Sequence, residues 1–493
     1  MRTCLLLVSS VVAVLVTEPA TSQLVVAPVE RSAFSQVSSY ASLREFVAGL
    51  PASRGIRSTV MATTSEGREI LAVRISSPCG EDSSKLRVLL FAQQHGDEPC
   101  GKEALTLLLA DCARGVCDDL LEKMDLVVVP QMNPDGAERR QRRNSEGIDL
   151  NRSHLLLHTP EVRGLHDLFA AWMPEVTMDI HEYGSFSKEW VDGGFVKSSD
   201  VQLGMLTNLN SPAALRTYQR TTVFPFVAAA MAEAGYSFSE YVVGSPQDRL
   251  RHSTTEINDG RQSFGILGTL SFIQEGRKWR TLDEQLKRRS QAQYAATKAL
   301  LKFVAEHAGQ IKEMVRQERE SLASAHGKRF YTRMDHVAGA SPLVIPVMNA
   351  RSGRDTTWTV TPYHGVVRAF DSTIIPSAYI IPAELKQVIE LLGRHRLQTV
   401  VAESLQKVSV EEYTLEQMGT CVIEEDTLPA PVLKSARRSY QLRPGDVLVP
   451  TSQMHSLFLA SVLEPASLWG LLKYPSMAES LVTNRQYRIL RLP

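Results

Sequence analysis

Residues 86–98 read LRVLLFAQQHGDE, an apolar run that leads directly into a polar turn. A short run of this kind, rich in β-favouring residues, predicts a buried strand over residues 86–91. The turn at Gly96 sets His95 and Glu98 three residues apart, a spacing at which an imidazole and a carboxylate can face the same side. These two side chains can provide two of the three protein ligands of a zinc site whose fourth position stays open.

Apolar strands alternate with helical patterns on either side of this stretch, which predicts an α/β fold. We expect a mixed, mainly parallel sheet with helices on both faces, because the strands are apolar throughout. The expected strands are 59–61, 70–73, 86–91, 126–130, 175–180 and 265–273, and the expected helices are 40–50, 103–113, 153–172, 225–235 and 282–308, the last running on to about 325.

The length of 493 residues predicts two to three domains. We expect a catalytic domain over residues 23–325 and a smaller mixed C-terminal domain over 326–493, whose role the sequence does not indicate. With 43% hydrophobic and 22% charged residues, the chain can bury a large core. Its formal net charge is zero, so nothing global indicates nucleic acid or an anionic membrane as a partner.

The first residues have the pattern of a secretory signal peptide. Arg2 precedes an apolar run over residues 4–16, and the small residues Ala20, Thr21 and Ser22 follow it. We expect residues 1–22 to be removed on export, to the periplasm or the exterior. The alternative, a membrane anchor, would need a longer apolar run, so no stable membrane anchor is expected.

Export would permit disulfide bonds. Loss of the signal peptide leaves an odd number of cysteines, namely Cys79, Cys100, Cys112, Cys117 and Cys421. Cys112 and Cys117 are close enough in sequence to close a small loop. Cys100 lies near Glu98, so a zinc thiolate has to be weighed, but a buried or disulfide-bonded cysteine is the favoured interpretation.

Polar residues also follow other predicted strands. His181 follows the strand at 175–180, and Glu275 follows the one at 265–273. Ligands of open α/β sheets bind beyond the carboxyl ends of the strands, so these residues can converge on one site. Two imidazoles and a carboxylate suit zinc, which makes His95, Glu98 and His181 the candidate ligands.

Five motifs occur in one order along the chain, and as a set they are far more specific than any of them alone. They are His95-Gly96-Asp97-Glu98, Asn133-Pro134-Asp135-Gly136, Gly147-Ile148-Asp149-Leu150-Asn151-Arg152, Asp179-Ile180-His181-Glu182-Tyr183 and Ser271-Phe272-Ile273-Gln274-Glu275. Together they resemble the zinc carboxypeptidases of the carboxypeptidase A family, also called funnelins, over roughly residues 40–305.

The resemblance implies one Zn²⁺ per chain, bound by His95, Glu98 and His181. It also implies that Asp149 accepts a hydrogen bond from the ring of His95, as ligating histidines normally require. Glu275 would be the general base that takes a proton from the zinc-bound water and passes it to the leaving amine.

The resemblance further implies a set of substrate contacts. Asn151 and Arg152 would hold the terminal carboxylate of the substrate, because a guanidinium can donate two parallel hydrogen bonds. Tyr183 would also contact substrate. Arg142 would polarise the scissile carbonyl and stabilise its oxyanion, with Arg143 as the alternative because a basic run blurs the register.

Two departures from the family pattern leave parts of the site unassigned. The family commonly carries a substrate-capping tyrosine some twenty residues before the base, where this chain has Ser253 and Thr254. Tyr236 and Tyr241 lie further away, so none is assigned. Asp259 and Arg261 fall near the expected side-chain pocket and predict opposite substrate charges. The residues left without an assigned role are therefore Tyr236, Tyr241, Ser253, Thr254, Asp259 and Arg261.

Two weaker patterns favour ordinary structural interpretations. The basic run at 138–143 is short and lacks interleaved aromatic residues, so a solvated turn is favoured over a nucleic-acid patch. His154 and His158 stand four apart on an expected helix, as metal ligands can, but packing or surface roles are more common there.

The sequence therefore predicts an exported zinc metallocarboxypeptidase acting on peptides with a free C-terminal carboxylate. An alternative is a cell-wall peptide amidase or an N-acyl amino acid deacylase on the same scaffold. A binding module with a decayed site is disfavoured, because ligands, base and carboxylate anchor are all present.

Overall fold

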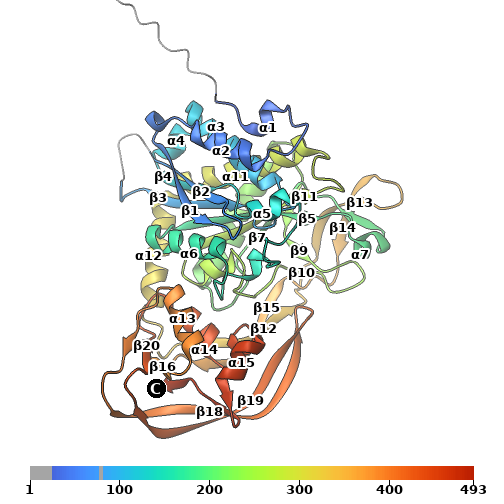
Figure 1. Ribbon diagram of the computed structural model, residues 1–493. Helices are drawn as coiled ribbons and strands as arrows, with labels where there is room; N and C mark the ends of the chain where they lie inside the picture. Colours follow the sequence, from blue (N-terminus) through green and yellow to red (C-terminus); the bar gives the residue numbers. More distant parts are fainter. Residues whose placement is uncertain (1–24, 77–81) are drawn as a thin grey trace, which may run out of the picture.

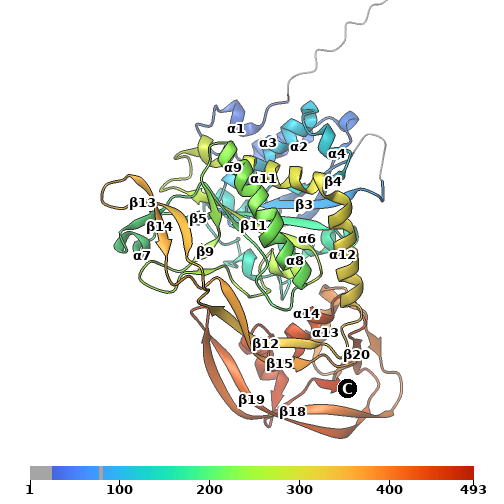
Figure 2. The same cartoon turned by 180° about the vertical axis from the view of Figure 1, so that it is seen from behind.

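The computed structural model describes residues 25–76 and 82–493. They form two lobes, which lie one above the other in Figure 1. The first lobe, which we call the catalytic lobe because the sequence predicts catalysis there, contains the central sheet and most of the helices. The C-terminal lobe contains a second large sheet and three helices, and the helix α12 (Ala308–Leu322) runs along one side of the molecule from the first lobe toward the second (Figure 2).

The central sheet has eight strands in the order β1-β2-β4-β3-β5-β11-β7-β8. The pairs β4–β3, β3–β5, β5–β11 and β7–β8 are parallel, and the pairs β1–β2, β2–β4 and β11–β7 are antiparallel. The predicted mixed, mainly parallel sheet is therefore confirmed. Its strands are β1 (Ile56–Thr63), β2 (Glu69–Ile75), β3 (Leu86–Ala92), β4 (Met124–Val129), β5 (Val176–Gly184), β7 (Val201–Gly204), β8 (Phe238–Glu240) and β11 (Leu270–Lys278).

Strand β3 explains why both faces of the sheet are covered. Its side chains alternate between two cores, with Val88 and Leu90 in one and Leu89 and Phe91 in the other. All four are fully buried. Helices lie on both faces of the sheet, as Figures 1 and 2 show from opposite sides. The helices that pack in the first core include α1 (Pro28–Arg31), α2 (Tyr40–Ala48), α3 (Cys100–Arg114), α4 (Asp118–Leu121), α9 (Phe224–Glu233) and α11 (Leu286–Glu306). Those that pack in the second core include α6 (Pro160–Trp172) and α10 (Gln262–Gly265).

Two expected elements begin later than the sequence pattern predicts. The helix expected over 153–172 begins only at Pro160, because Thr159 caps its first turn and the ring of proline is accommodated there. The preceding residues form turns, so His154 and His158 do not share a helix. The strand expected over 265–273 begins at Leu270, since the helix α10 occupies residues before it.

The C-terminal lobe is built on a second eight-stranded sheet in the order β17-β20-β16-β23-β18-β22-β21, with β19 paired to β18. Figure 1 shows its long β18–β19 hairpin along the edge of the lobe. The elements are β12 (Arg329–Val337) paired with β15 (Val366–Ile374), β16 (Ala378–Ile381), β17 (Val400–Val401), β18 (Gln406–Ile423), β19 (Asp426–Leu442), β20 (Val447–Pro450), β21 (Val482–Thr483), β22 (Gln486–Tyr487), β23 (Leu490–Leu492), α13 (Lys386–Arg394), α14 (Ser456–Leu463) and α15 (Pro475–Leu481).

One hairpin of the C-terminal half belongs to the catalytic side. Strand β13 (Leu343–Asn349) pairs with β14 (Asp355–Val360) and with β6 (Phe195–Lys197), so the three form one small sheet. Trp358 stacks on Phe195 at 5.1 Å between ring centroids, which fixes this hairpin against β6. The chain therefore returns to the catalytic lobe after residue 326, the predicted start of the C-terminal domain.

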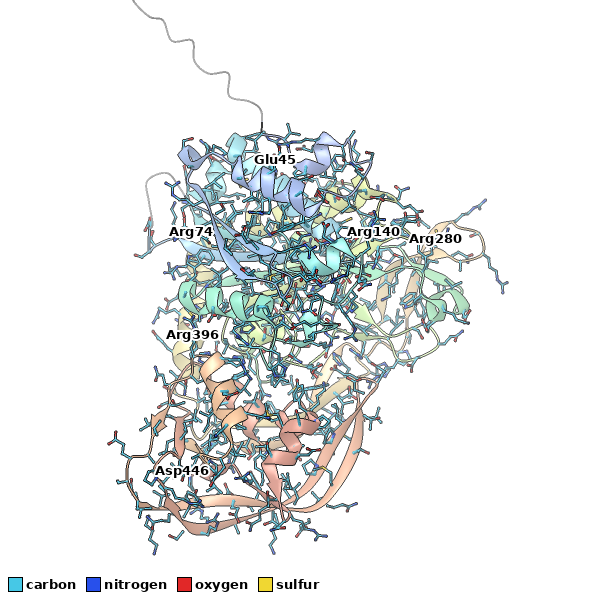
Figure 3. The ribbon with its side chains drawn as sticks, viewed as in Figure 1. Glu45, Arg74, Arg140, Arg280, Arg396 and Asp446 are labelled. Atoms are coloured by element: carbon cyan, nitrogen blue, oxygen red, sulfur yellow. The ribbon has the colours of Figure 1, made fainter. Side chains whose placement is uncertain are left out.

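The two lobes share a hydrophobic core. The second core cluster joins Phe91 and Phe264 of the catalytic lobe to Tyr379 and Phe458 of the C-terminal lobe. At the margin of this junction the guanidinium of Arg396, labelled in Figure 3, donates a hydrogen bond of 2.8 Å to Asp167 of α6. A continuous core of this kind holds the lobes in one arrangement.

Several predictions about export and cysteine pairing concern residues outside the part of the chain that the structure describes. The signal peptide and its cleavage point lie there, as does Cys79. Among the described residues, none of the helices combines the length and apolar character that a membrane crossing requires. Cys100, Cys112, Cys117 and Cys421 are free thiols, so Cys112 and Cys117 are not joined in the structure.

Candidate active site

The predicted ligand turn follows β3, at the carboxyl end of a buried parallel strand. Gly96 is required there because a Cβ atom would lie 2.1 Å from the backbone carbon of Gly136. The turn is fixed by the side chain of Asn133, whose amide donates to the carbonyl of Gln94 at 3.1 Å and to that of Arg142 at 3.2 Å. The Asn133 turn thus locks the ligand turn and the Arg142 segment together.

His95, Glu98 and His181 turn their donor atoms toward one point. Nδ1 of His95 lies 2.9 Å from Oε1 of Glu98 and 3.1 Å from Nδ1 of His181. Nδ1 of His181 in turn lies 3.0 Å from Oε2 of Glu98. Donor atoms at zinc distances of about 2.0–2.1 Å in a tetrahedral site lie roughly 3.3 Å apart. The donor set and its spacing therefore fit a zinc ion.

The outward-facing nitrogens of both imidazoles meet carboxylates, which fixes the rings as metal sites require. Nε2 of His95 lies 3.1 Å from Asp149, and Nε2 of His181 lies 2.8 Å from Asp179. Burial alone would raise the pKa of Asp149, but its hydrogen bond to His95 and the charge of Arg142 hold the pKa below its usual range. The role of Asp179 was not apparent from the sequence, although it stands two residues before His181.

Arg142 reaches the donor atoms, whereas Arg143 points away from them. Nη1 of Arg142 lies 3.2 Å from Nδ1 of His95 and 3.5 Å from Oε1 of Glu98, and its Nε donates to Asp149 at 3.0 Å. Arg143 donates to the carbonyl of Gly147. The side chain of Arg142 is 45% exposed, so it lies at the rim of the site and can meet a substrate carbonyl.

A pocket of about 550 Å³ opens over this centre. Asn151, Arg152 and Tyr183 line it. Arg152 is exposed to the pocket, and Nη1 of its guanidinium donates to the carbonyl of Asn151 at 2.7 Å. The hydroxyl of Tyr183 donates to the carbonyl of Ser199, which fixes the position of this side chain at the pocket.

Glu275 lies in the same pocket, on a strand that is directly paired with the strand of His181. Its register partner on β5 is His181 itself. Burial raises the pKa of Glu275 to about 7, a value suited to proton transfer near neutrality. A buried carboxylate beside the donor cluster can accept a proton from an attacking nucleophile.

Tyr241 is a pocket residue that the sequence analysis left unassigned. It lies close enough to Glu275 for the two groups to influence each other's pKa, and its side chain lines the cavity. Its distance along the chain from Glu275 exceeds the family spacing, so no local signal marked it. Ser253 and Thr254, which stand near that spacing, line the pocket as well.

The opposite charges of Asp259 and Arg261 neutralise each other. Nη2 of Arg261 lies 3.0 Å from Oδ2 of Asp259, and both residues are buried. Arg261 also donates to the carbonyls of Met205 and Thr254. Neither charge is free to select a substrate side chain.

His154 has a structural environment that the sequence pattern did not indicate. It is fully buried, its Nε2 donates to Oε1 of Gln94 at 2.9 Å, and its Nδ1 lies 3.1 Å from Nε2 of His166. Gln94 in turn donates to Asp179 at 2.8 Å. His154 therefore belongs to a buried network behind the donor cluster. His158 is exposed.

A second group of potential ligands lies at the edge of the pocket, and its two carboxylates are committed to other contacts. Asp335, His336 and Glu424 come together there. Arg249 donates two hydrogen bonds to Asp335, at 2.9 and 3.2 Å, and Glu424 accepts from the backbone amide of Thr255 at 2.7 Å. These carboxylates anchor protein groups.

Comparisons with known proteins bear on the segment that carries the donor cluster. Residues 46–190 match the family Peptidase_M14, described as zinc carboxypeptidase. Carboxypeptidase 2 of Trichophyton rubrum is 25% identical over 455 residues, which cover 87% of this chain and 81% of that protein. Carboxypeptidase E of Caenorhabditis elegans is 33% identical over 106 residues, or 18% of this chain and 22% of that protein.

Solved structures similar to this chain include the carboxypeptidase A of Helicoverpa armigera, with a TM-score of 0.45 and 17% identity over 56% of this chain and 75% of that one. A metallo-carboxypeptidase from Pseudomonas aeruginosa gives a TM-score of 0.43 and 22% identity over 55% of this chain and 68% of that one.

Proposed function

Because this chain is an enzyme of the zinc carboxypeptidase family, a peptide hydrolase as its sequence predicted, we propose that it is an exported exopeptidase that releases the C-terminal residue of peptides. His95, Glu98 and His181 would hold one zinc ion per chain. The observation that carries the proposal is the convergence of three donor atoms, an arginine rim and a buried carboxylate in one pocket.

His95, Glu98 and His181 would hold a zinc ion that, when bound, would lower the pKa of water and polarise the scissile carbonyl. The protein groups around it divide the remaining work. Arg142 meets the negative charge that develops on the carbonyl oxygen, and Arg152 with Asn151 binds the terminal carboxylate of the substrate. Tyr183 offers its ring as a wall for the substrate.

Glu275 serves as the general base. It accepts the proton of the attacking water and then delivers it to the nitrogen of the leaving amino acid. Its burial supports this role, because a carboxylate with a raised pKa both accepts and returns a proton near neutral pH. Tyr241, which lies beside Glu275, would orient this carboxylate before substrate arrives.

A panel of short peptides tests the proposal. Zinc-loaded protein should release free amino acid from peptides with an unblocked C-terminus, and release should stop when zinc is removed by a chelator and return when zinc is restored. C-terminally amidated versions of the same peptides should be poor substrates, since they lack the carboxylate that Arg152 binds. Equal cleavage of free and amidated peptides would contradict the exopeptidase assignment.

The same panel separates the alternative functions. An N-acyl amino acid deacylase would cleave acylated single residues and leave the peptides intact, and a cell-wall amidase would require a muropeptide.

Metal analysis of purified protein measures the proposed stoichiometry of one zinc per chain. The N-terminal sequence of protein recovered from the exterior or the periplasm tests export and cleavage near Ser22.

A further inference from the structure

One wall of the pocket, which we call the pocket wall, is built by the segment 249–260. This segment is irregular apart from the two residues of β10 (Arg251–His252). It contributes Arg251, Ser253, Thr254, Glu256 and Asp259 to the pocket lining. A loop of this kind has no regular backbone ladder of its own, so other contacts must fix its position.

The segment is connected directly to the carboxylate anchor. The side-chain amide of Asn258 donates to the carbonyl of Arg152 at 2.7 Å, and its oxygen accepts from the amide of Leu155 at 2.6 Å. The backbone amide of Gly260 donates to Oδ1 of Asn151 at 2.8 Å. A shift of the segment would therefore move Asn151 and Arg152 as well.

The C-terminal lobe holds the same segment from the other side. At the tip of the β18–β19 hairpin, Glu424 accepts from the hydroxyl of Thr254 at 2.6 Å and from the amide of Thr255 at 2.7 Å. The neighbouring Glu425 accepts from Arg251 at 2.6 Å. These hydrogen bonds join residues of the two lobes across the edge of the pocket, which Glu424 itself lines.

A second element of the lobe reaches the other end of the segment. Nζ of Lys473 lies 2.6 Å from Oε1 of Glu256, and the hydroxyl of Tyr474 accepts from the side-chain amide of Asn258 at 3.0 Å. Asn258 therefore bridges Tyr474 of the C-terminal lobe and the carbonyl of Arg152. This bridge connects the lobe to the anchor through the side chain of one residue.

The hairpin tip has a backbone that favours other residues than glutamate. Glu424 and Glu425 have φ values of 52° and 72°, a conformation in which asparagine and glycine are preferred for a two-residue hairpin turn. The side chain of Glu424 is nevertheless only 3% exposed. The contacts of these carboxylates with the segment offset the cost of the turn.

We propose that the C-terminal lobe is part of the substrate-binding machinery, with Glu424 and Tyr474 as positioning residues that hold the segment 249–260 against the Asn151–Arg152 anchor. The proposal rests on the function proposed above. It gives the C-terminal lobe a role in binding the free carboxylate of the substrate, while the proton-transfer groups stay on the central sheet.

Two variants and a matched control test the proposal. Glu424→Gln replaces the charged carboxylate, whose two oxygens accept from Thr254 and Thr255, by a neutral amide with a single accepting oxygen. Tyr474→Phe removes only the hydroxyl that accepts from Asn258. Glu412→Gln is the control, because Glu412 is a buried glutamate of the same hairpin whose partner, Arg438, belongs to the hairpin itself. Zinc content is measured for all proteins.

Hydrogen–deuterium exchange over residues 249–262 is the first measurement. We expect faster exchange there, by about five-fold or more, in Glu424→Gln and a smaller increase in Tyr474→Phe, with the wild-type rate in Glu412→Gln. The second measurement is the affinity of zinc-loaded protein for a panel of N-acetyl amino acids and their amides. The free acids should bind about five-fold more weakly to Glu424→Gln, with the amides unaffected.

For peptide cleavage we expect KM to rise several-fold while kcat stays within two-fold, because the groups that act on the scissile bond are untouched. Exchange and free-acid affinity equal to those of wild type in both variants would overturn the proposal. A wild-type protein that binds N-acetyl amino acids but cleaves no peptide would instead reject the proposed function. The exchange and affinity comparisons decide the role of the lobe in that case too.

Discussion

The donor cluster and the pocket wall line one cavity, yet they are built in different ways. His95 follows β3, and His181 and Glu275 lie within the neighbouring parallel strands β5 and β11, so a buried sheet fixes their spacing. The wall at 249–260 is a loop, and its position depends on residues far away in the chain, such as Glu424. One side of the pocket is thus set by the sheet, and the other by contacts between lobes.

The difference predicts which properties each side controls. Chemistry requires donor atoms and a base within a few tenths of an ångström of their working positions, which strands provide. Substrate binding tolerates a more adaptable wall, and loops on a rigid scaffold commonly carry it. Changes on the sheet side should therefore lower kcat, and changes on the wall side should raise KM.

The largest effect expected is that of Glu275→Gln. The amide cannot accept the proton of the attacking water, so kcat should fall by about 1,000-fold. Zinc content should stay at the wild-type value, because Glu275 is not among the three donors. Steady-state kinetics with elemental analysis measures both quantities, and a near-normal kcat would remove Glu275 from the role of base.

Arg152→Ala should have the next largest effect, and it acts on binding. Loss of charge-assisted hydrogen bonds to the substrate carboxylate should lower kcat/KM for free peptides by roughly 100-fold. Amidated peptides, which start from a low rate, should lose little. Arg143→Ala is the control, since its guanidinium donates to a backbone carbonyl outside the pocket. Equal losses for free and amidated peptides would show that Arg152 is not the anchor.

Asp149→Asn should weaken zinc itself. The amide can no longer offer His95 a charged acceptor, so zinc affinity should fall by about 30-fold. Competition with a fluorescent chelator gives the affinity, and saturating zinc should restore much of the activity. Asp167→Asn, at the junction of the lobes, is the control. An unchanged zinc affinity would mean that His95 keeps its orientation without this partner.

The sequence predicted the sheet side of the site far better than the wall side. Residues 86–98 carry both the apolar run of a buried strand and the two ligands, so local pattern and chemistry agree there. His181 and Glu275 could be placed because the carboxyl ends of parallel strands share one edge. These are consequences of strand order and of a motif set.

The wall could not be predicted for a physical reason. Tyr241 reaches Glu275, and Glu424 holds Thr255, only because loops far apart in sequence are folded against each other. Neither residue stands in a periodic or motif context. The Asp259–Arg261 pair shows the same limit, since the sequence offered two charges and only the structure reveals that they neutralise each other.

The junction behind the wall gives the smallest predicted effect, and it concerns stability at acid pH. His395 of the C-terminal lobe is 7% exposed and its Nε2 donates to the carbonyl of Leu155 at 2.7 Å. Burial lowers the pKa of His395 to about 3. An unfolded histidine binds its proton near pH 6.5, so between these values the unfolded state holds one proton more than the folded state.

The sign follows from this difference. As the pH falls from about 6.5 toward 3, His395 favours the unfolded state, and its share of the slope is about 1.4 kcal/mol per pH unit. His395→Gln removes that share, so its free energy of unfolding should depend less steeply on pH by about this amount between pH 6 and 4. Urea unfolding at a series of pH values measures both slopes, with His326→Gln, an exposed histidine, as the control. Identical slopes for wild type and His395→Gln would mean that His395 takes up its proton as readily in the folded state as in the unfolded chain, so that burial at the junction of the lobes does not keep it neutral in acid.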